Sequence, residues 1–248
     1  MIIKNYRFGD LVFQIATPIT LKEDARFEAF RSSDADEVDF HIEILPKEAD
    51  PQEPPVRISR NGIHTLVELE PDLISGITLG NLLGAVQAAL WLPDHGCFLL
   101  HCAYVLHEGK ALLLCAPSGT GKSTLAHYWN QCRGAKIINE DRAMIIFREE
   151  QVYACGCWAT GMARICENVT APVEAVVLLG QGSENRIMSL RPSEMLRRLV
   201  PQTSFDSLDS EQCRKIIDLV SDLMEKVKVI GYECIRDESA VDELEKNL

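Results

Sequence analysis

The sequence predicts an α/β protein whose amino-terminal part is built from β-strands. Three observations predict this class. The first 70 residues contain short runs of alternating apolar and polar residues separated by turn signals. Beyond residue 116, short apolar runs alternate with segments of helical periodicity, and a glycine-rich segment joins one run to one helix. We expect an antiparallel β region over 1–75 and an α/β domain with a mixed sheet over 76–248.

The composition is that of an ordinary globular protein. Apolar residues make up 46% and charged residues 25% of the chain, which excludes the disordered and collagen-like classes. No uninterrupted apolar stretch is long enough for a membrane span, so we expect no membrane partner. The net charge of −12 disfavours nucleic acid as a partner, because an acidic surface repels phosphate backbones.

The cysteines and the amino terminus indicate a cytoplasmic protein. The nine cysteines are scattered rather than paired, and residues 1–13 carry charges too early for the apolar core of a signal peptide. Cys155 and Cys157 are separated by one residue rather than the two usual in zinc sites, which disfavours a metal site there. We therefore expect reduced thiols.

Turn signals divide the amino-terminal region into strands. Gly9-Asp10 separates two apolar runs, as a hairpin turn does. Residues 38–44 alternate with the period of a half-buried strand. Asn61-Gly62 is a strong type I′ turn signal, and that turn would place Ile58 opposite Thr65. The region is therefore predicted to be a small antiparallel sheet.

The second part begins with a helix over 78–91, where apolar residues recur at helical spacing. Two apolar runs, 98–106 and 111–115, follow as buried strands around Glu108-Gly109. Further strands are expected at 136–139, 143–147, 152–154, 173–179 and 228–234, and further helices at 123–132, 192–199, 208–227 and 239–246.

Residues 112–124 combine a strand, a glycine-rich turn and the start of a helix. Gly119 and Gly121 allow backbone N–H groups to surround a polyphosphate, and the helix dipole points its positive end at that anion. Lys122 would reach the β- and γ-phosphates of ATP, and the Ser123 hydroxyl would ligate Mg²⁺. The predicted nucleotide-binding residues are Ala116, Pro117, Ser118, Gly119, Thr120, Gly121, Lys122, Ser123 and Thr124.

The loop departs from the strict P-loop pattern at one position, because Ala116 stands where the pattern has glycine. The strand before it and the helix after it still favour a phosphate-binding loop over an accidental glycine turn. Such a loop needs an acid at the end of a neighbouring strand. Glu140 and Asp141 directly follow the run 136–139; the alternative for them is a solvated acidic turn paired with Arg142.

From His101 to Ser123 the sequence resembles the strand, hairpin and P-loop segment of HPr kinase/phosphorylase catalytic domains. In that family a histidine begins the strand, and Ala-Asp-Asp falls where this chain has Asn139-Glu140-Asp141. The resemblance spans about residues 95–180. It implies the P-loop fold that this family shares with phosphoenolpyruvate carboxykinases.

The resemblance also implies roles for individual residues. Ser123 and Asp141 would hold Mg²⁺, and the loop from Ala116 would bind the ATP phosphates. Glu140 would be the general base, His101 would lie beside the transferred phosphate, and Lys122 would complete the catalytic set.

Two departures from the family affect the expected acceptor and activity. The segment 161–165 stands where the family has Glu-x-Arg-Gly-Leu-Gly, so the chain is more similar to the looser group of HPr-kinase-related proteins, some of which accompany peptide-modification systems. HPr itself is then not the expected acceptor. Glu140 also replaces aspartate, which lengthens the side chain by one methylene where placement matters.

Arginines downstream are candidates for a clamp on the transferred phosphate. Arg197 and Arg198 lie in an amphipathic helix, where a solvated face is the favoured interpretation. Arg191, directly before Pro192, is the better candidate, and Arg186 is a further one.

The leading hypothesis is an ATP-dependent kinase that transfers the γ-phosphate to a hydroxyl, that of serine in a protein or peptide. One alternative is a nucleotide-binding sensor or interaction subunit without phosphotransfer, which Ala116 and Glu140 favour. Another is a phosphoenolpyruvate carboxykinase-like metabolic enzyme, for which the chain is short. Resemblance to a hexameric family raises the chance of a homo-oligomer, and no motif for the acceptor is legible in the amino-terminal sheet.

Overall fold

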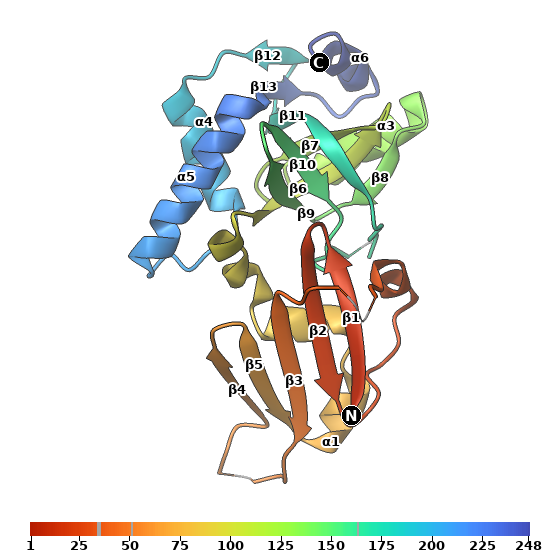
Figure 1. The fold of residues 1–248 in the computed structure, drawn as a ribbon. Helices are drawn as coiled ribbons and strands as arrows, with labels where there is room; N and C mark the ends of the chain where they lie inside the picture. The colour runs from red at the N-terminus through yellow and green to blue at the C-terminus, as the bar shows by residue number, and fades with distance from the viewer. Residues whose placement is uncertain (34–35, 51, 163) are drawn as a thin grey trace. The chain divides into compact units, whose positions relative to one another are not determined.

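The computed structural model describes residues 1–33, 36–50, 52–162 and 164–248 (Figure 1). The chain divides into two compact units, Met1–Ala88 and Ala89–Leu248, each with its own β-sheet. No helix in these residues is both long and apolar enough to cross a membrane.

The first unit contains a mixed five-stranded sheet. Its strands are β1 (Ile2–Phe8), β2 (Leu11–Thr17), β3 (Phe40–Pro46), β4 (Val56–Asn61) and β5 (His64–Leu69), in the spatial order β1-β2-β3-β5-β4. The predicted hairpin at Gly9-Asp10 is confirmed as β1–β2. The prediction of an antiparallel sheet is wrong at the centre, because β3 runs parallel to both β2 and β5. The alternation of apolar residues reports which face of a strand is buried but not the strand's direction.

Long connections make the parallel pairs. Residues 18–39 link β2 to β3 and include the 3-10 helix η1 (Ala25–Phe30), which gives the chain room to return to the other end of the sheet. After β3, the chain reaches the edge strand β4, and the β4–β5 hairpin then brings β5 between β4 and β3. The direction of β3 therefore depends on the path of the connecting segments, which the alternation of apolar residues within the strands does not predict.

Two predicted local features are shifted. The β4–β5 turn consists of Gly62 and Ile63, with Gly62 at φ +60°, so Ile58 lies opposite Val67 instead of Thr65. The glycine thus takes the first turn position rather than the second.

The predicted helix over 78–91 is shorter than expected. After α1 (Pro71–Gly76), α2 spans Leu79–Ala85, and Gln87 then adopts a left-handed φ of +54° before the 3-10 segment η2 (Ala88–His95). A residue with positive φ cannot continue a right-handed helix. The apolar periodicity of residues 78–91 therefore extends beyond the end of α2.

The second unit contains an eight-stranded mixed sheet, and every strand predicted for it is confirmed. The strands are β6 (Phe98–His107), β7 (Lys110–Cys115), β8 (Lys136–Asn139), β9 (Arg142–Arg148), β10 (Gln151–Cys155), β11 (Thr170–Gln181), β12 (Arg186–Met188) and β13 (Lys228–Cys234). Their order is β10-β9-β6-β7-β11-β13-β12, with β8 paired to β6. β7, β11 and β13 run parallel to one another.

Helices cover both faces of this sheet. The predicted helices are confirmed as α3 (Lys122–Arg133), α4 (Pro192–Leu199), α5 (Ser210–Lys226) and α6 (Ser239–Glu245), and η3 (Val200–Gln202) follows α4. Trp129 of α3 and Leu244 of α6 are fully buried on one face, while Leu199 of α4 and Val220 of α5 are fully buried on the other. The α/β architecture with a mixed sheet is therefore as the sequence predicts.

Candidate functional site

Strand direction brings the predicted functional segments to one edge of the second sheet. The glycine-rich loop follows the carboxyl end of β7, and Gln181 and Arg236 lie at the carboxyl ends of the parallel strands β11 and β13. Both β7 and β8 are antiparallel to β6, so the turn after β8 and His101 in the first half of β6 reach the same edge. Ligands of α/β proteins bind at such carboxyl edges.

The glycine-rich loop has the conformation expected of its two glycines. It connects the end of β7 at Cys115 to the start of α3 at Lys122. Gly119 has φ +79° and Gly121 has φ +119°, values that side chains with a Cβ rarely adopt. A Cβ on either glycine would meet no atom within 4 Å, so the loop is open where these residues face. Backbone conformation, not crowding by protein, requires glycine here.

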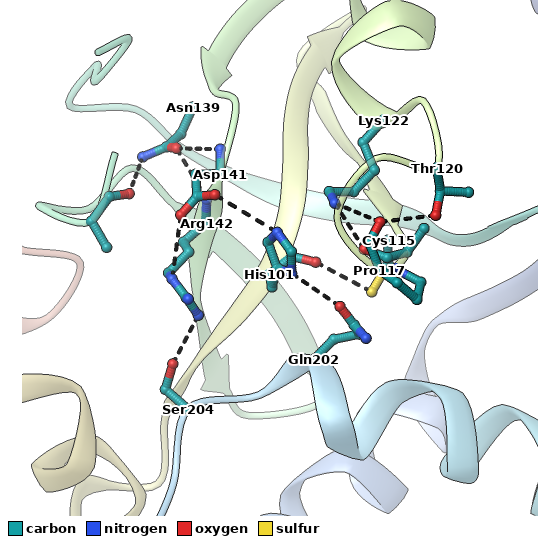
Figure 2. Close-up of polar contacts among 12 residues, drawn as sticks. His101, Cys115, Pro117, Thr120, Lys122, Asn139, Asp141, Arg142, Gln202 and Ser204 are labelled. Carbon is teal, nitrogen blue, oxygen red and sulfur yellow. Dashed lines mark hydrogen bonds and ion pairs between the residues drawn. The ribbon is translucent and has the colours of Figure 1, made fainter. Parts of the chain in front are cut away.

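Lys122 lies on the inside of this loop. It is only 7% exposed, and its amine donates hydrogen bonds to the carbonyls of Ala116 (2.8 Å) and Pro117 (3.3 Å), as Figure 2 shows. Burial lowers the pKa of the Lys122 amine. From the opposite side, the amide of Gln181 donates to the carbonyl of Gly119 at 3.4 Å. The loop is thus held by hydrogen bonds from Lys122, which lies inside it, and from Gln181 of β11.

A buried amide shapes the acidic turn after β8. The side chain of Asn139 is fully buried; its Nδ2 group donates to the carbonyls of Cys157 (3.4 Å) and Ala159 (3.1 Å). Its Oδ1 atom accepts from the backbone N–H groups of Asp141 (2.9 Å) and Arg142 (3.1 Å) (Figure 2). This side chain therefore fixes the direction in which the turn presents its carboxylates.

Asp141 faces His101 across the sheet edge. The Nε2 atom of His101 lies 3.7 Å from Oδ1 of Asp141, and its Nδ1 atom lies 3.0 Å from Oε1 of Gln202 (Figure 2). Burial lowers the pKa of His101, and the positive charge of Lys122 lowers it further. These effects favour the neutral form of the imidazole, which lies between Gln202 and Asp141.

Glu140 points to a different part of the site. Its side chain is 10% exposed, and Oε1 lies 3.3 Å from Nε2 of His127 on α3 without a hydrogen bond. His127 follows Ser123 by four residues, so the two side chains share one face of α3. Glu140 therefore holds a carboxylate oxygen free of hydrogen bonds near the start of α3.

A cleft of about 460 Å³ unites these groups. It is lined by His101, Ser118, Gly119, Gly121, Lys122, Ser123, Thr124, Glu140, Asp141, Gly161, Met162 and Arg236. Three predicted nucleotide-binding residues, Ala116, Pro117 and Thr120, line a second cavity instead. Both predicted carboxylates, His101 and Lys122 are brought together in the cleft.

Several residues of the site were not foreseen. Asn139 is predicted only as the end of a strand, Gln181 lies beyond the predicted strand 173–179, and Gln202 lies 101 positions from its partner His101. Arg236 could have been found from its position just after the last predicted strand. The segment 161–165 contributes Gly161 and Met162, whereas Ala163 lies outside the described residues.

The predicted arginine candidates separate into two groups. Arg186 is paired with Glu233 at 2.7 Å, and Arg191 is paired with Glu194 at 3.2 Å. Arg191 lines neither cavity: its guanidinium pairs with Glu194, whose carboxylate also accepts a hydrogen bond from the backbone N–H of Arg191 at the start of α4. A clamp role for Arg191 stays a prediction. Arg197 and Arg198 are exposed, as a solvated face requires, and they also line the second cavity.

The residues of the cleft fit Mg²⁺ and a nucleotide. No group of three or more His, Cys, Asp and Glu side chains that could hold a metal occurs among residues 1–33, 36–50, 52–162 and 164–248. Mg²⁺ needs no such cage, since it keeps waters and takes one or two carboxylates plus substrate phosphates. Glu140, with its buried oxygen free of hydrogen bonds, and the adjacent start of α3 meet that requirement.

Comparisons with known proteins give one family. The model of the family described as SynChlorMet cassette protein ScmC matches residues 77–215, which is more than half of the chain. No curated protein matches significantly. Among solved structures, the Hpr(Ser) kinase/phosphatase from Coxiella burnetii is similar with a TM-score of 0.34 and 13% identity, over 60% of this chain and 91% of that chain. A TM-score of this size carries no argument about function.

Proposed function

The chain belongs to the ScmC family, and we propose that it is an ATP-dependent phosphotransferase that acts on a hydroxyl group. One observation carries the proposal: a single cleft of about 460 Å³ contains a glycine loop at a helix start, a buried lysine, two carboxylates and His101, which lies 3.7 Å from Asp141. Serine in a protein or peptide is the acceptor that the family resemblance implies.

The loop side of the cleft supports phosphate binding. The first N–H groups of α3 have no partner within the helix, and the helix dipole favours an anion at that end. Lys122 adds a positive charge on the inside of the same loop. Together these groups would bind the β- and γ-phosphates of ATP.

The contacts of the two carboxylates support a division of roles. The resemblance implies Asp141 for Mg²⁺ and Glu140 for the base, but the contacts favour the reverse. Glu140 lies over the helix face that carries Ser123, where the two would hold Mg²⁺. Asp141 lies beside His101. When bound, Mg²⁺ would neutralise charge on the phosphates.

The His101–Asp141 pair has a place for one proton. In the proposed reaction the acceptor oxygen bonds to the γ-phosphorus, and the bond from that phosphorus to the bridging oxygen breaks. ADP leaves with the bonding electrons. The hydroxyl proton passes to Oδ1 of Asp141, which lies 3.7 Å from Nε2 of His101. Lys122 stabilises charge on the phosphates throughout.

Two variants test the function and the division of roles. Wild type should convert ATP to ADP in a Mg²⁺-dependent reaction, with water or a pool of serine peptides as acceptor. Asp141→Asn should lower kcat about 100- to 10,000-fold, the usual worth of a general base, at unchanged Mg²⁺ half-saturation. Glu140→Gln should instead raise the Mg²⁺ concentration needed for half-maximal rate. Glu174→Gln, in the Lys110 pair outside the cleft, is the control.

The outcomes distinguish the hypotheses. If Glu140→Gln abolishes kcat and Asp141→Asn shifts the Mg²⁺ requirement, the roles follow the family resemblance instead. ATP binding by wild type without any Mg²⁺-dependent turnover would overturn the phosphotransferase and identify a nucleotide-binding subunit.

A further inference from the structure

A second cavity lies on the other side of the glycine-rich loop. Its volume is about 440 Å³, similar to that of the first cleft. It is lined by Cys115, Ala116, Pro117, Thr120, Leu178, Leu179, Gly180, Arg197, Arg198, Pro201 and Gln202. None of these residues lines the first cleft. The loop therefore forms a wall between two cavities, and α4 and η3 supply the opposite side of the second.

The charge of this second cavity is positive. Arg197 and Arg198 are exposed and make no hydrogen bond or ion pair with any residue that the structure describes. The pKa of Glu194 is lowered chiefly by hydrogen bonds from Arg191, and Arg197 contributes less. Among the residues that the structure describes, no acidic one lines the cavity. Two such cations in a chain with a net charge of −12 favour an anionic ligand.

The rest of the lining favours a ligand with more than a charge. Leu178, Pro117 and Pro201 give the cavity apolar surface, and Gln202 and Thr120 add hydrogen-bonding groups. Guanidinium groups recognise carboxylates through paired hydrogen bonds. A peptide segment with a carboxylate and neighbouring apolar atoms matches both the arginines and the apolar surface. A bare inorganic anion would use only the arginines.

Gln202 connects this cavity to the proposed transfer site. It lines the second cavity, and its Oε1 atom lies 3.0 Å from Nδ1 of His101, whose other nitrogen faces Asp141 (Figure 2). The lysine of the loop is held by the carbonyls of Ala116 and Pro117, which line the second cavity as well. Residues that line this cavity therefore contact His101 and Lys122 of the first cleft directly.

We propose that the second cavity binds the acceptor: a peptide whose phosphorylated hydroxyl lies close in sequence to an acidic residue, with the carboxylate paired to Arg197 and Arg198. This inference rests on the proposed phosphotransfer, because it assigns the acceptor side of that reaction.

Binding of labelled peptides tests the assignment without requiring turnover. The probes are fluorescein-labelled nine-residue peptide pools with a central serine, each with glutamate fixed at one position, and matched pools with glutamine there. Fluorescence anisotropy should show at least one glutamate pool bound about tenfold more tightly than its glutamine match. Arg197→Gln with Arg198→Gln should remove this preference and leave Mg-ATP affinity unchanged. Arg191→Gln, which lines neither cavity, should retain it.

Three results would overturn the inference: equal binding of matched pools by wild type, a preference that survives replacement of both arginines, or loss of Mg-ATP affinity in that variant. The last would assign the arginines to the nucleotide. A glutamate preference without any phosphate transfer would overturn the proposed function but keep the peptide site. Transfer without a preference would do the opposite.

Discussion

The two walls of the cleft are built in different ways. The loop wall, residues 116–123, comes from one continuous segment and is held by its own carbonyls and by the start of α3. The acidic wall joins Glu140 and Asp141 to His101 of another strand, and a buried amide and Gln202 hold it in place. A binding element can thus be local in sequence, while the reacting groups depend on contacts across the fold. A substitution that disrupts one wall should therefore leave the structure of the other wall intact.

The largest test of this separation is removal of the buried amide. Asn139→Ala leaves the N–H groups of Asp141 and Arg142 and two carbonyls without their partner. We expect a loss of about 2–4 kcal/mol in the free energy of unfolding and a large fall in kcat. The affinity for ATP without Mg²⁺, which the loop wall provides, should change little, whereas the Mg²⁺ concentration needed for half-maximal rate should rise because Glu140 lies in the same turn. Denaturation followed by tryptophan fluorescence reports on this unit, because all three tryptophans lie in it.

Asn130→Ala is the matched control, because this exposed amide makes a single hydrogen bond to Ala135 near the end of α3. It should cost less than about 1 kcal/mol. If the affinity for ATP without Mg²⁺ fell in step with kcat in Asn139→Ala, the two walls would not be independent.

A smaller change at the acidic wall is Gly161→Ala. A Cβ at this position would lie 3.2 Å from Cβ of Asp141, so the carboxylate must shift by a few tenths of an ångström. We expect about a tenfold loss in kcat/KM for phosphotransfer at constant Mg-ATP affinity, since small misplacements of a positioned group are costly. Gly84→Ala, whose Cβ would meet nothing within 4 Å, should have no such effect. Unchanged turnover in Gly161→Ala would show that the position of Asp141 is not critical.

The smallest expected effect concerns pH. Burial and the charge of Lys122 hold the pKa of His101 below its ordinary value of about 6.5, so the folded protein binds this proton less readily than the unfolded chain. The contribution of His101 to the free energy of unfolding is therefore present above about pH 6.5 and is lost as the pH falls through the pKa of the folded state. The acid limb of kcat/KM should lie below the same value. His101→Asn should change that limb, while His107→Asn, in the same strand, should not; a limb above pH 6.5 would contradict the assignment.

The fold of the second unit could be predicted because its signals are local. Each strand and helix there has its own periodicity and its own turn residues, and the strand–glycine–helix order of 111–133 is visible in the sequence alone. The direction of β3 in the first unit could not be predicted, because it depends on the path of residues 18–39. The turn at Gly62 shifted by one position, since either position of the turn accepts a glycine.

The site was predictable to the same extent. The glycine loop, Lys122 and the two carboxylates follow from motif and strand ends. The partnership of His101 with Gln202 and the supporting role of Asn139 do not, because each joins segments that only the strand order brings together. Arg197 and Arg198 were assigned to solvent from helical periodicity, which says nothing of the cavity beside their helix.

The central claim is that the loop wall binds Mg-ATP through Lys122. Isothermal titration of Mg-ATP tests it most directly, with Lys122→Met as the variant because methionine keeps much of the buried stem. Lys110→Met, an exposed lysine of β7 paired with Glu174, is the control. We predict one Mg-ATP per chain for wild type and for the control, and an affinity about 100-fold weaker for Lys122→Met. Equal affinity of wild type and Lys122→Met, or no binding by wild type, would contradict the account.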